Sequence, residues 1–226
     1  MALRKAIVSG TASGIGRAIA IELLESNWCV TGIDRDPSDI SHTNYAHVRA
    51  DLTDPETISS AVIQFDGIDG IVHAAGFMLT GSLGTLKPDD SLRMWKIHVL
   101  AAETLVNSAI TRLNSGARVV LIGSRTSRGA GQKSQYAASK AALIGMSRSW
   151  AIELVQRGIT VNIVSPAATL TPMLQDSKRE GVPPKLPPMG RFVDPHEVAA
   201  MVSHLMGPHG GSITGQEIVL CAGSSL

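Results

Sequence analysis

Residues 9–16, SGTASGIG, decide the fold of this 226-residue chain. They follow a short apolar run at 6–9 and precede a segment of helical periodicity at 15–26. Glycines permit a tight turn with close backbone approach, and the helix that follows offers unpaired N–H groups and its positive dipole end to a phosphate. Glycine turns are common between strands and helices, so this stretch predicts a dinucleotide site only together with what surrounds it.

The rest of the chain alternates short apolar runs with longer helical segments, which is typical of a parallel sheet covered by helices on both faces. We therefore expect an α/β fold with a doubly wound (Rossmann-type), mostly parallel, seven-stranded sheet. The expected strands are 6–9, 29–33, 46–50, 70–74, 118–122, 160–164 and 218–221, and the expected helices are 15–26, 55–64, 90–113, 134–156 and 195–206.

The length suits a single domain over residues 1–226 that buries a substantial core without a second one. The proline-dense stretch GVPPKLPPMG, residues 181–190, breaks both helical and strand periodicity. It lies between the sixth strand and the last helix, in a segment long enough to act as a lid. We expect a substrate lid at about 172–190.

Composition excludes several classes of function. Hydrophobic residues make up 44% of the chain and charged residues 17%, which argues against disorder. The formal net charge is +1 and the basic residues are scattered, so neither nucleic acid nor a membrane surface is an expected partner. Cys29 and Cys221 lie in apolar runs, and we expect buried free thiols and no metal site. The N-terminus has no long apolar segment, which indicates a cytoplasmic protein.

Asp34 follows the second expected strand, eighteen residues after Gly16. A carboxylate at this offset accepts the hydroxyls of an adenosine ribose and repels a 2′-phosphate, which favours NAD as the cofactor. Two alternatives remain open at this stage. Asp34 could be a solvated loop acid or a helix cap, and Arg35 could pair with the phosphate of NADP.

Tyr136 and Lys140 stand four residues apart in a helix-forming run, on one helical face. The charge of the lysine can stabilise a tyrosinate and so lower a phenol pKa that is ordinarily about 10. Each unit corresponds to about 1.4 kcal/mol, so a near-neutral pKa needs roughly 4 kcal/mol from the surroundings. One lysine does not supply all of it, and an oxidised nicotinamide ring is the natural second cation.

These motifs together resemble the short-chain dehydrogenase/reductase family, in its small single-domain branch. Residues 9–16 are similar to the family's TGxxxGxG with Ser9 in place of threonine, and HAAG at 73–76 is similar to NNAG. Ser124 followed by Tyr136 and Lys140 resembles the catalytic serine and YxxxK. NIVSPAATLTPM, SITGQEIVLCAG and MGRFVDPHEVA resemble three further family segments, so the resemblance covers essentially the whole chain.

The resemblance implies that Ser124 orients the substrate oxygen, that Tyr136 is the acid/base, and that Lys140 holds the nicotinamide ribose and lowers the pKa of the tyrosine. It further implies a small-molecule substrate and a homotetramer. Phosphate-preferring members often have a basic residue where this chain has Ser13, which again favours NAD. The cofactor-binding positions implied are Gly10, Ser13, Gly14, Ile15, Gly16, Asp34, Arg35, Asp51, Leu52, Ala74, Ala75, Gly76, Tyr136, Lys140, Pro166, Thr169 and Thr171.

The chain departs from the family pattern in four places. His98 stands where an asparagine usually holds a water of a proton relay; a histidine can also hold a water or exchange a proton, so we include it among the catalytic residues. The alternative is a helix histidine bonded to a backbone carbonyl. His73 replaces an asparagine and is expected to change only local strand support. Ala167 replaces a glycine, and the loop between Ser124 and Tyr136 is one residue short.

The sequence thus predicts an NAD-dependent oxidoreductase that interconverts a small or cyclic secondary alcohol and its ketone, with Tyr136 as acid/base. A 3-oxoacyl thioester reductase using NADPH and a noncatalytic NAD-binding sensor are the alternatives. Arg125 and Arg128 could grip a carboxylate or phosphate, although loop arginines are usually exposed. The candidates for an apolar substrate pocket are Phe77, Met78, Trp95, Leu170, Met173 and Leu174, which could equally be core or lid packing.

Overall fold

A seven-stranded parallel sheet forms the centre of the protein in the computed structural model, which describes residues 3–175 and 182–226. The strand order is β3-β2-β1-β4-β5-β6-β7, and every neighbouring pair is parallel. The predicted doubly wound α/β fold is therefore confirmed. The strands are β1 (Arg4–Ser9), β2 (Trp28–Asp34), β3 (Tyr45–Arg49), β4 (Ile68–His73), β5 (Leu113–Ile122), β6 (Thr160–Pro166) and β7 (Glu217–Leu220).

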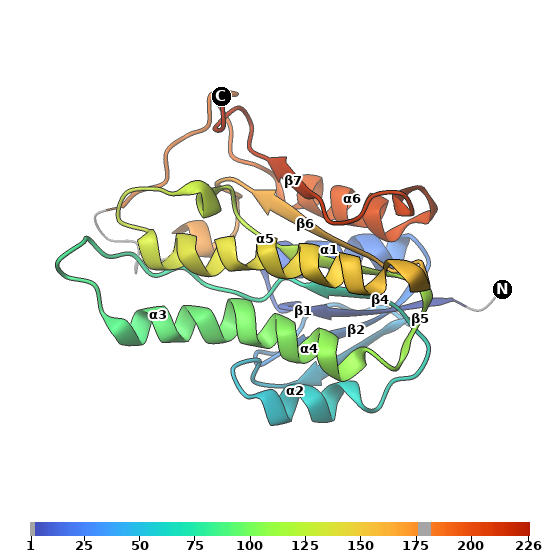
Figure 1. Cartoon of the computed structure of the whole chain (residues 1–226). Helices are drawn as coiled ribbons and strands as arrows, with labels where there is room; N and C mark the ends of the chain where they lie inside the picture. The colour runs from blue at the N-terminus through green and yellow to red at the C-terminus, as the bar shows by residue number, and fades with distance from the viewer. Residues whose placement is uncertain (1–2, 176–181) are drawn as a thin grey trace.

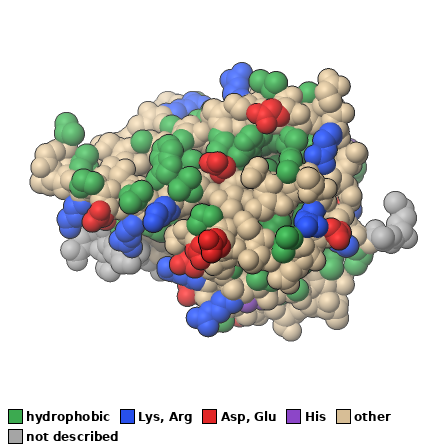
Figure 2. Space-filling model, turned by 60° about the horizontal axis from the view of Figure 1, so that its bottom comes forward, with side chains coloured by type: hydrophobic (Ala, Val, Ile, Leu, Met, Phe, Trp, Pro, Cys, Tyr) green, Lys and Arg blue, Asp and Glu red, His purple; other side chains and the backbone are tan. Residues whose placement is uncertain are grey.

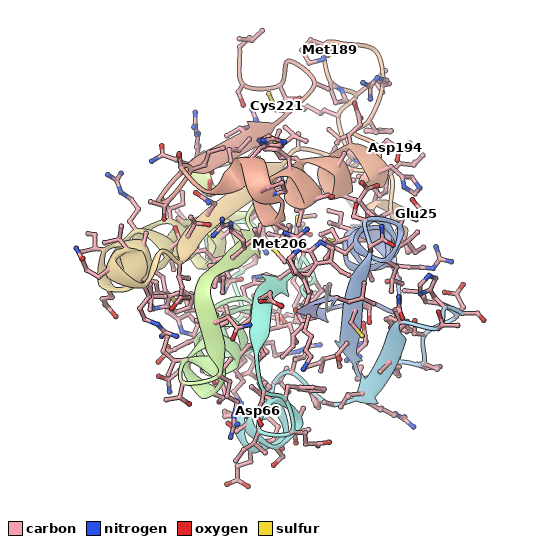
Figure 3. The ribbon with its side chains drawn as sticks, turned by 90° about the vertical axis from the view of Figure 1, so that its right-hand side faces the viewer. Glu25, Asp66, Met189, Asp194, Met206 and Cys221 are labelled. Carbon is pink, nitrogen blue, oxygen red and sulfur yellow. The ribbon has the colours of Figure 1, made fainter. Side chains whose placement is uncertain are left out.

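Helices cover both faces of this sheet, and α3, α4 and α5 lie on its near side in Figure 1. Alternate residues of one strand enter opposite cores, as Ile7 and Val8 of β1 do, so the strands are continuous apolar runs. Figure 3 shows Met206 between α6 and the strands, where its Cε lies 2.2 Å from the point that a Cβ on Gly70 would occupy. The helices are α1 (Gly14–Glu25), α2 (Pro55–Val62), α3 (Pro88–Trp95), α4 (Ala101–Ala109), α5 (Ser134–Leu154) and α6 (Pro195–Met206).

The expected single helix at 90–113 is wrong in two respects. A π-helical turn, η1 (Lys96–Leu100), separates α3 from α4. Its Ile97, His98 and Val99 are three consecutive buried side chains, which one regular α-turn cannot direct inward together. The helix also ends at Ala109, and β5 begins at Leu113 rather than at 118, because Leu113 pairs with Ile68 before the register shift in β4.

The segment between β6 and α6 contains a short 3₁₀ helix, η4 (Pro172–Gln175). Residues 176–181 of the expected lid lie outside the described residues, so the lid prediction is tested neither way. Farther along, the Met189 N–H donates to the carbonyl of Ala222 at 3.1 Å, and Met189 and Cys221 lie at the same end of the molecule in Figure 3. Asp194 then begins α6 with a reciprocal capping box to Glu197.

Further observations concern the two cysteines, membrane-spanning helices and the surface charges. Both cysteines are free thiols, but they are partly exposed, so the expectation of buried thiols is wrong. Cys29 borders a small cavity beside Lys5, and Cys221 follows β7, which is an edge strand with solvent beside it. No helix within residues 3–175 and 182–226 is long and apolar enough to cross a membrane. On the face drawn in Figure 2, basic and acidic side chains are interspersed with hydrophobic ones.

Candidate active site

An open cleft of about 260 Å³ lies at the carboxyl ends of β1, β2 and β4. The chain leaves β1 for β2 on one side and returns to β4 on the other, so the strand order reverses at β1. Ligands of open α/β sheets bind at such a reversal. The predicted cofactor residues that line this cleft are Gly10, Ser13, Gly14, Ile15, Gly16, Asp34, Arg35, Asp51, Leu52, Ala74, Ala75, Gly76 and Thr171.

The glycine turn leaves no room for side chains. Gly10 has a φ of +79°, and a Cβ there would lie 2.8 Å from the backbone nitrogen of Ala75. A Cβ on Gly16 would lie 2.1 Å from the carbonyl oxygen of Gly10. The N-terminus of α1 therefore opens into the cleft with its N–H groups uncovered, which fits the pyrophosphate of a dinucleotide.

Asp34 lies at the carboxyl end of β2 and lines the cleft. Its carboxylate accepts hydrogen bonds from the N–H of Ala12 at 3.0 Å and of Asp36 at 3.1 Å, so it joins the glycine turn to the loop after β2. Asp34 therefore caps this local turn and lines the cleft at the same time. Arg35 lines the same rim, where its 76% exposed side chain lies 3.6 Å from the carboxylate of Asp36.

Tyr136 and Lys140 are both buried on α5. The Nζ atom of Lys140 donates to the carbonyl oxygen of Ile122 at 2.8 Å, which fixes the lysine at the carboxyl end of β5. Ser124 follows two residues later, where its Oγ accepts from the N–H of Thr126 at 3.1 Å and caps a 3₁₀ turn. Three of the four predicted catalytic residues therefore lie at the carboxyl end of β5 and on the helix α5 that is bonded to it.

Burial lowers the pKa of Lys140 from its ordinary value to about 7. From the sequence, this side chain is expected to carry a full positive charge. In the protein alone, ammonium and amine are instead both populated near neutral pH. Whatever stabilises the ammonium form therefore decides how much help the tyrosine receives.

His98 joins this group to the cleft. It is fully buried in the π-helical turn, and its ring meets that of Tyr136 edge-on, with centroids 5.4 Å apart at 83°. Its Nδ1 lies 2.9 Å from Oγ of Ser139, and its Nε2 lies 2.7 Å from the point that a Cβ on Gly76 would occupy. Nζ of Lys140 lies 3.7 Å from the same point, so the catalytic group meets the cleft at Gly76.

His73 forms a second buried link, which the sequence did not foresee. Its Nε2 donates to the carbonyl of Ile97 at 3.0 Å, and its Nδ1 accepts from the hydroxyl of Ser9 at 2.9 Å. The Ser9 oxygen in turn accepts from the N–H groups of Ala74 and Ala75. His73 therefore does more than support its own strand. Through Ser9 and Ile97 it ties the end of β1 and the loop at Ala74 and Ala75 to the π-helical turn.

Acid is expected to destabilise the fold through His73. Burial, followed by the charge of Lys140, lowers the pKa of His73 to about 3. The unfolded chain has a histidine pKa of about 6.5, so it binds a proton at pH values where the folded chain does not. The contribution of neutral His73 to stability is complete above pH 6.5 and is lost as pH falls toward 3. Urea unfolding should show wild type losing about 2 kcal/mol more than His73→Asn between pH 7 and pH 5. Equal losses in the two proteins would contradict this assignment.

Four of the predicted cofactor residues do not line the cleft, namely Tyr136 and Lys140 on α5, and Pro166 and Thr169 farther along the chain. Pro166 ends β6, and Thr169 is buried with its hydroxyl donating to the carbonyl of Ala167 at 3.0 Å. Both shape the loop that brings Thr171 to the cleft, where its Cγ2 lies 3.3 Å from the point of a Cβ on Gly14. They support the loop in this structure.

The two arginines after Ser124 have protein partners. Arg125 donates to the carbonyl of Ser224, and Arg128 lies 3.6 Å from the carboxylate of Glu217. Both interactions tie the 3₁₀ turn η2 (Arg125–Arg128) to β7 and the C-terminal turn. The expectation that they grip an anionic substrate therefore has no support in these contacts.

The apolar pocket candidates have three kinds of surroundings, apart from Leu174, which is partly exposed in the 3₁₀ helix η4. Phe77 and Met173 line the cleft, and Met78 packs with Met94 against Tyr136. Trp95 and Leu170 are 40% and 55% exposed and so do not form a closed pocket wall. Besides Phe77 and Met173, the residues that line the cleft but were not predicted as cofactor-binding are Ala12, Asp36, Thr53 and Ile97. Thr53 had a readable signal, since the D-L-T sequence allows Asp51 to accept from its N–H, as it does at 2.8 Å.

Comparison with known proteins gives consistent matches. A family model described as enoyl-(acyl carrier protein) reductase matches residues 10–225. The 3-oxoacyl-[acyl-carrier-protein] reductase FabG of Salmonella typhimurium is 34% identical over 231 residues, which cover 94% of this chain and 93% of that protein. A short chain dehydrogenase family protein from Francisella tularensis superposes with a TM-score of 0.91 at 26% identity over 99% of both chains. A short chain dehydrogenase from Burkholderia cenocepacia in complex with NADP has a TM-score of 0.85 at 30% identity, covering 99% of this chain and 98% of that one.

Proposed function

The chain belongs to the short-chain dehydrogenase/reductase family of oxidoreductases, and from that premise we propose that it interconverts a small secondary alcohol and its ketone with NAD. Tyr136 is the acid/base, and Ser124 orients the substrate oxygen. The observation that carries the proposal is the meeting of Tyr136, Lys140 and His98 with the cofactor cleft at Gly76.

The chain's own residues move one proton. In the oxidative direction the Tyr136 phenolate takes the proton of a carbinol hydroxyl that is hydrogen-bonded to Ser124. The ammonium of Lys140 stabilises that phenolate from one helical turn away. A nicotinamide bound in the cleft supplies the hydride acceptor, or the donor in reverse. The apolar side chains around Tyr136, namely Phe77, Met78 and Met94, exclude water from the reacting oxygen.

The choice of NAD rests on Asp34. Its carboxylate is held in place at the cleft by hydrogen bonds from two backbone N–H groups. A fixed negative charge there accepts ribose hydroxyls and repels a 2′-phosphate. Arg35 does not offset this charge, since its exposed side chain lies beside Asp36.

Asp34→Ser is expected to relax discrimination between the two cofactors. Removing the carboxylate removes the repulsion, and the serine hydroxyl can still serve the turn. The ratio of kcat/KM for NAD to that for NADP should fall at least about tenfold, which corresponds to about 1.4 kcal/mol of lost selectivity. Asp36→Ser is the matched control, because it removes a neighbouring cleft-lining carboxylate that lies 3.6 Å from the guanidinium of Arg35 and is not part of the glycine turn. An unchanged ratio in Asp34→Ser would mean that the ribose is recognised elsewhere.

A 3-oxoacyl thioester reductase is the second candidate, and the relative from Salmonella typhimurium, which is named for that reaction, favours it. Both candidates need the same hydride and proton transfer but different substrates. A panel of secondary alcohols, cyclic ketones and a 3-oxoacyl thioester, each with NAD(H) and NADP(H), separates them. Turnover of the thioester alone would replace the alcohol proposal. Cofactor binding seen by NADH fluorescence, without turnover of any compound, would favour a noncatalytic sensor.

We also propose that the chain assembles as a homotetramer. Apolar side chains are exposed on α3, on α5 and just after α5, among them Leu92, Ile152 and Val155. Met146 and Trp150 on α5 pack partly into the internal core and so offer less to a partner. Light scattering of the purified protein measures the assembly directly.

A further inference from the structure

The 3₁₀ turn η2 (Arg125–Arg128) has no buried side chain, so apolar packing contributes little to its position. A 3₁₀ turn also has poorer hydrogen-bond geometry than an α-helix. Ser124 nevertheless depends on this turn, because its Oγ accepts from the N–H of Thr126 at 3.1 Å and so caps it. Whatever holds η2 in place therefore also holds the serine.

The cap decides which part of the Ser124 hydroxyl is available to a substrate. A hydroxyl has one proton to give and two lone pairs that accept. Since Oγ takes the N–H of Thr126 on a lone pair, its proton is left for the substrate oxygen that Ser124 is proposed to orient. A displacement of η2 would move the N–H donor and turn that proton in another direction.

Two arginines anchor η2, and they are not equivalent. Arg128 lies 3.6 Å from the carboxylate of Glu217, and its side chain is 63% exposed, so this ion pair contributes little. Arg125 is half-buried, and its Nη2 donates to the carbonyl oxygen of Ser224. A hydrogen bond from a charged group is stronger than one between neutral groups. Arg125 is therefore the stronger of these two anchors.

The acceptor of the Arg125 bond lies in the C-terminal turn, residues 221–226, which has hydrogen bonds of its own. The N–H of Ser224 donates to the carbonyl of Cys221 at 2.8 Å, and the N–H of Leu226 donates to the carbonyl of Gly223 at 3.1 Å. The Ser224 carbonyl is therefore part of an ordered turn that directly follows β7.

The C-terminal turn also holds a second segment, residues 187–190, which lies between β6 and α6. The N–H of Met189 donates to the carbonyl of Ala222 at 3.1 Å. The Cβ of Pro188 lies 3.2 Å from the point that a Cβ on Gly223 would occupy. The turn η2 and the segment ahead of α6 therefore share one anchor, although they are far apart in the sequence.

We propose that Arg125 is a positioning residue, which fixes the hydroxyl of Ser124 by holding η2 to the carbonyl of Ser224. Through the C-terminal turn it also couples that hydroxyl to residues 187–190. The inference rests on the proposed function for the role of Ser124. Arg125 does not line the cofactor cleft, so its effect falls on turnover and not on cofactor binding.

Arg125→Met keeps an unbranched stem and removes the guanidinium. We expect kcat to fall about tenfold, the smaller end of what a hydrogen bond from a charged group contributes, with NADH affinity unchanged. Arg157→Met is the matched control. Arg157 also donates to backbone carbonyls, those of Ile110 at 3.0 Å and Leu113 at 2.6 Å, but at the amino end of β5. Its loss should lower the free energy of unfolding without lowering kcat.

A double-mutant cycle shows whether Arg125 acts through Ser124. In a Ser124→Ala background, Arg125→Met should leave kcat unchanged, because the hydroxyl that it positions is already gone. A merely structural role would lower kcat by the same factor in both backgrounds. Such multiplying losses would overturn the proposal.

Amide hydrogen exchange tests the link without any substrate. The N–H of Thr126, which the Ser124 cap protects, should exchange about tenfold faster in Arg125→Met and at the wild-type rate in Arg157→Met. Unchanged exchange of Thr126 in Arg125→Met would overturn the proposal. Faster exchange in a protein that turns over none of the compounds tested would sustain the link and remove the oxidoreductase function.

Gly223→Ala disturbs the C-terminal turn while leaving both ends of the Arg125 bond in the chain. Its new Cβ would meet Pro188, and alanine rarely adopts the φ of +86° found there. We expect the N–H groups of Met189 and Thr126 to exchange faster together. Faster exchange of Met189 alone would contradict the coupling between residues 187–190 and the catalytic serine.

Discussion

Replacing Tyr136 with phenylalanine is expected to lower turnover by about 10²- to 10⁴-fold, the usual contribution of a positioned acid/base. The variant loses one oxygen and keeps the ring that packs against His98, Met78 and Met94. Because the cofactor cleft is lined by other residues, NADH should bind with nearly unchanged affinity. Steady-state rates and NADH fluorescence titration measure the two effects separately.

The matched control is Tyr45→Phe, since the chain contains only two tyrosines. The Tyr45 hydroxyl donates to Oγ1 of Thr11 at 3.1 Å, below the glycine turn and away from the catalytic group. Its removal should cost one hydrogen bond, about 0.5–1.5 kcal/mol of stability, without a comparable loss of turnover. A Tyr136→Phe protein that retains half of the wild-type rate would exclude the tyrosine from the chemistry.

Replacing Gly16 with alanine is expected to weaken cofactor binding more than replacing either of the other glycines of the turn. The new Cβ would lie 2.1 Å from the carbonyl oxygen of Gly10 and 2.6 Å from its carbonyl carbon, so backbone must move. Overpacking of this kind costs about 1–3 kcal/mol. Since the atoms displaced form the turn itself, we expect the Kd for NADH to rise roughly ten- to a hundredfold, together with a lower free energy of unfolding.

Gly145→Ala is the control for this effect. Gly145 lies exposed within α5, and outside the neighbouring backbone of its own helix no atom lies within 4 Å of the Cβ that an alanine would add. The same substitution should therefore stabilise the helix, by up to about 1 kcal/mol, and leave cofactor affinity alone. If Gly16→Ala bound NADH as tightly as Gly145→Ala does, the turn would not be the pyrophosphate site.

Local sequence signals predicted most of the fold and the part of the site formed by the glycine turn and Asp34. The glycine turn, Asp34 and the strands up to β4 are governed by nearby residues, so composition and spacing were sufficient. The expected helix at 195–206 has the observed bounds of α6, because Asp194 and Pro195 define its start chemically.

Long-range contacts explain what the sequence did not reveal. The π-helical turn depends on packing against β4 and α5, which no helical periodicity records. The same holds for Nε2 of His98, whose surroundings come from residues 22 and 42 positions away, Gly76 and Lys140. The early start of β5 reflects pairing with Ile68 and not the composition of 113–117. The lowered pKa of Lys140 follows from burial, which spacing alone cannot reveal.

The π-helical turn at Lys96–Leu100 has a consequence for variants in which one residue is deleted. A π-turn amounts to one residue added to an α-helix. Deleting one residue there would let regular winding resume, with the flanking helices α3 and α4 keeping nearly their present faces. What would be lost is the widened turn that buries Ile97, His98 and Val99 side by side. A one-residue deletion at this place is therefore expected to spare the helix and to disturb the contact of His98 with Ser139.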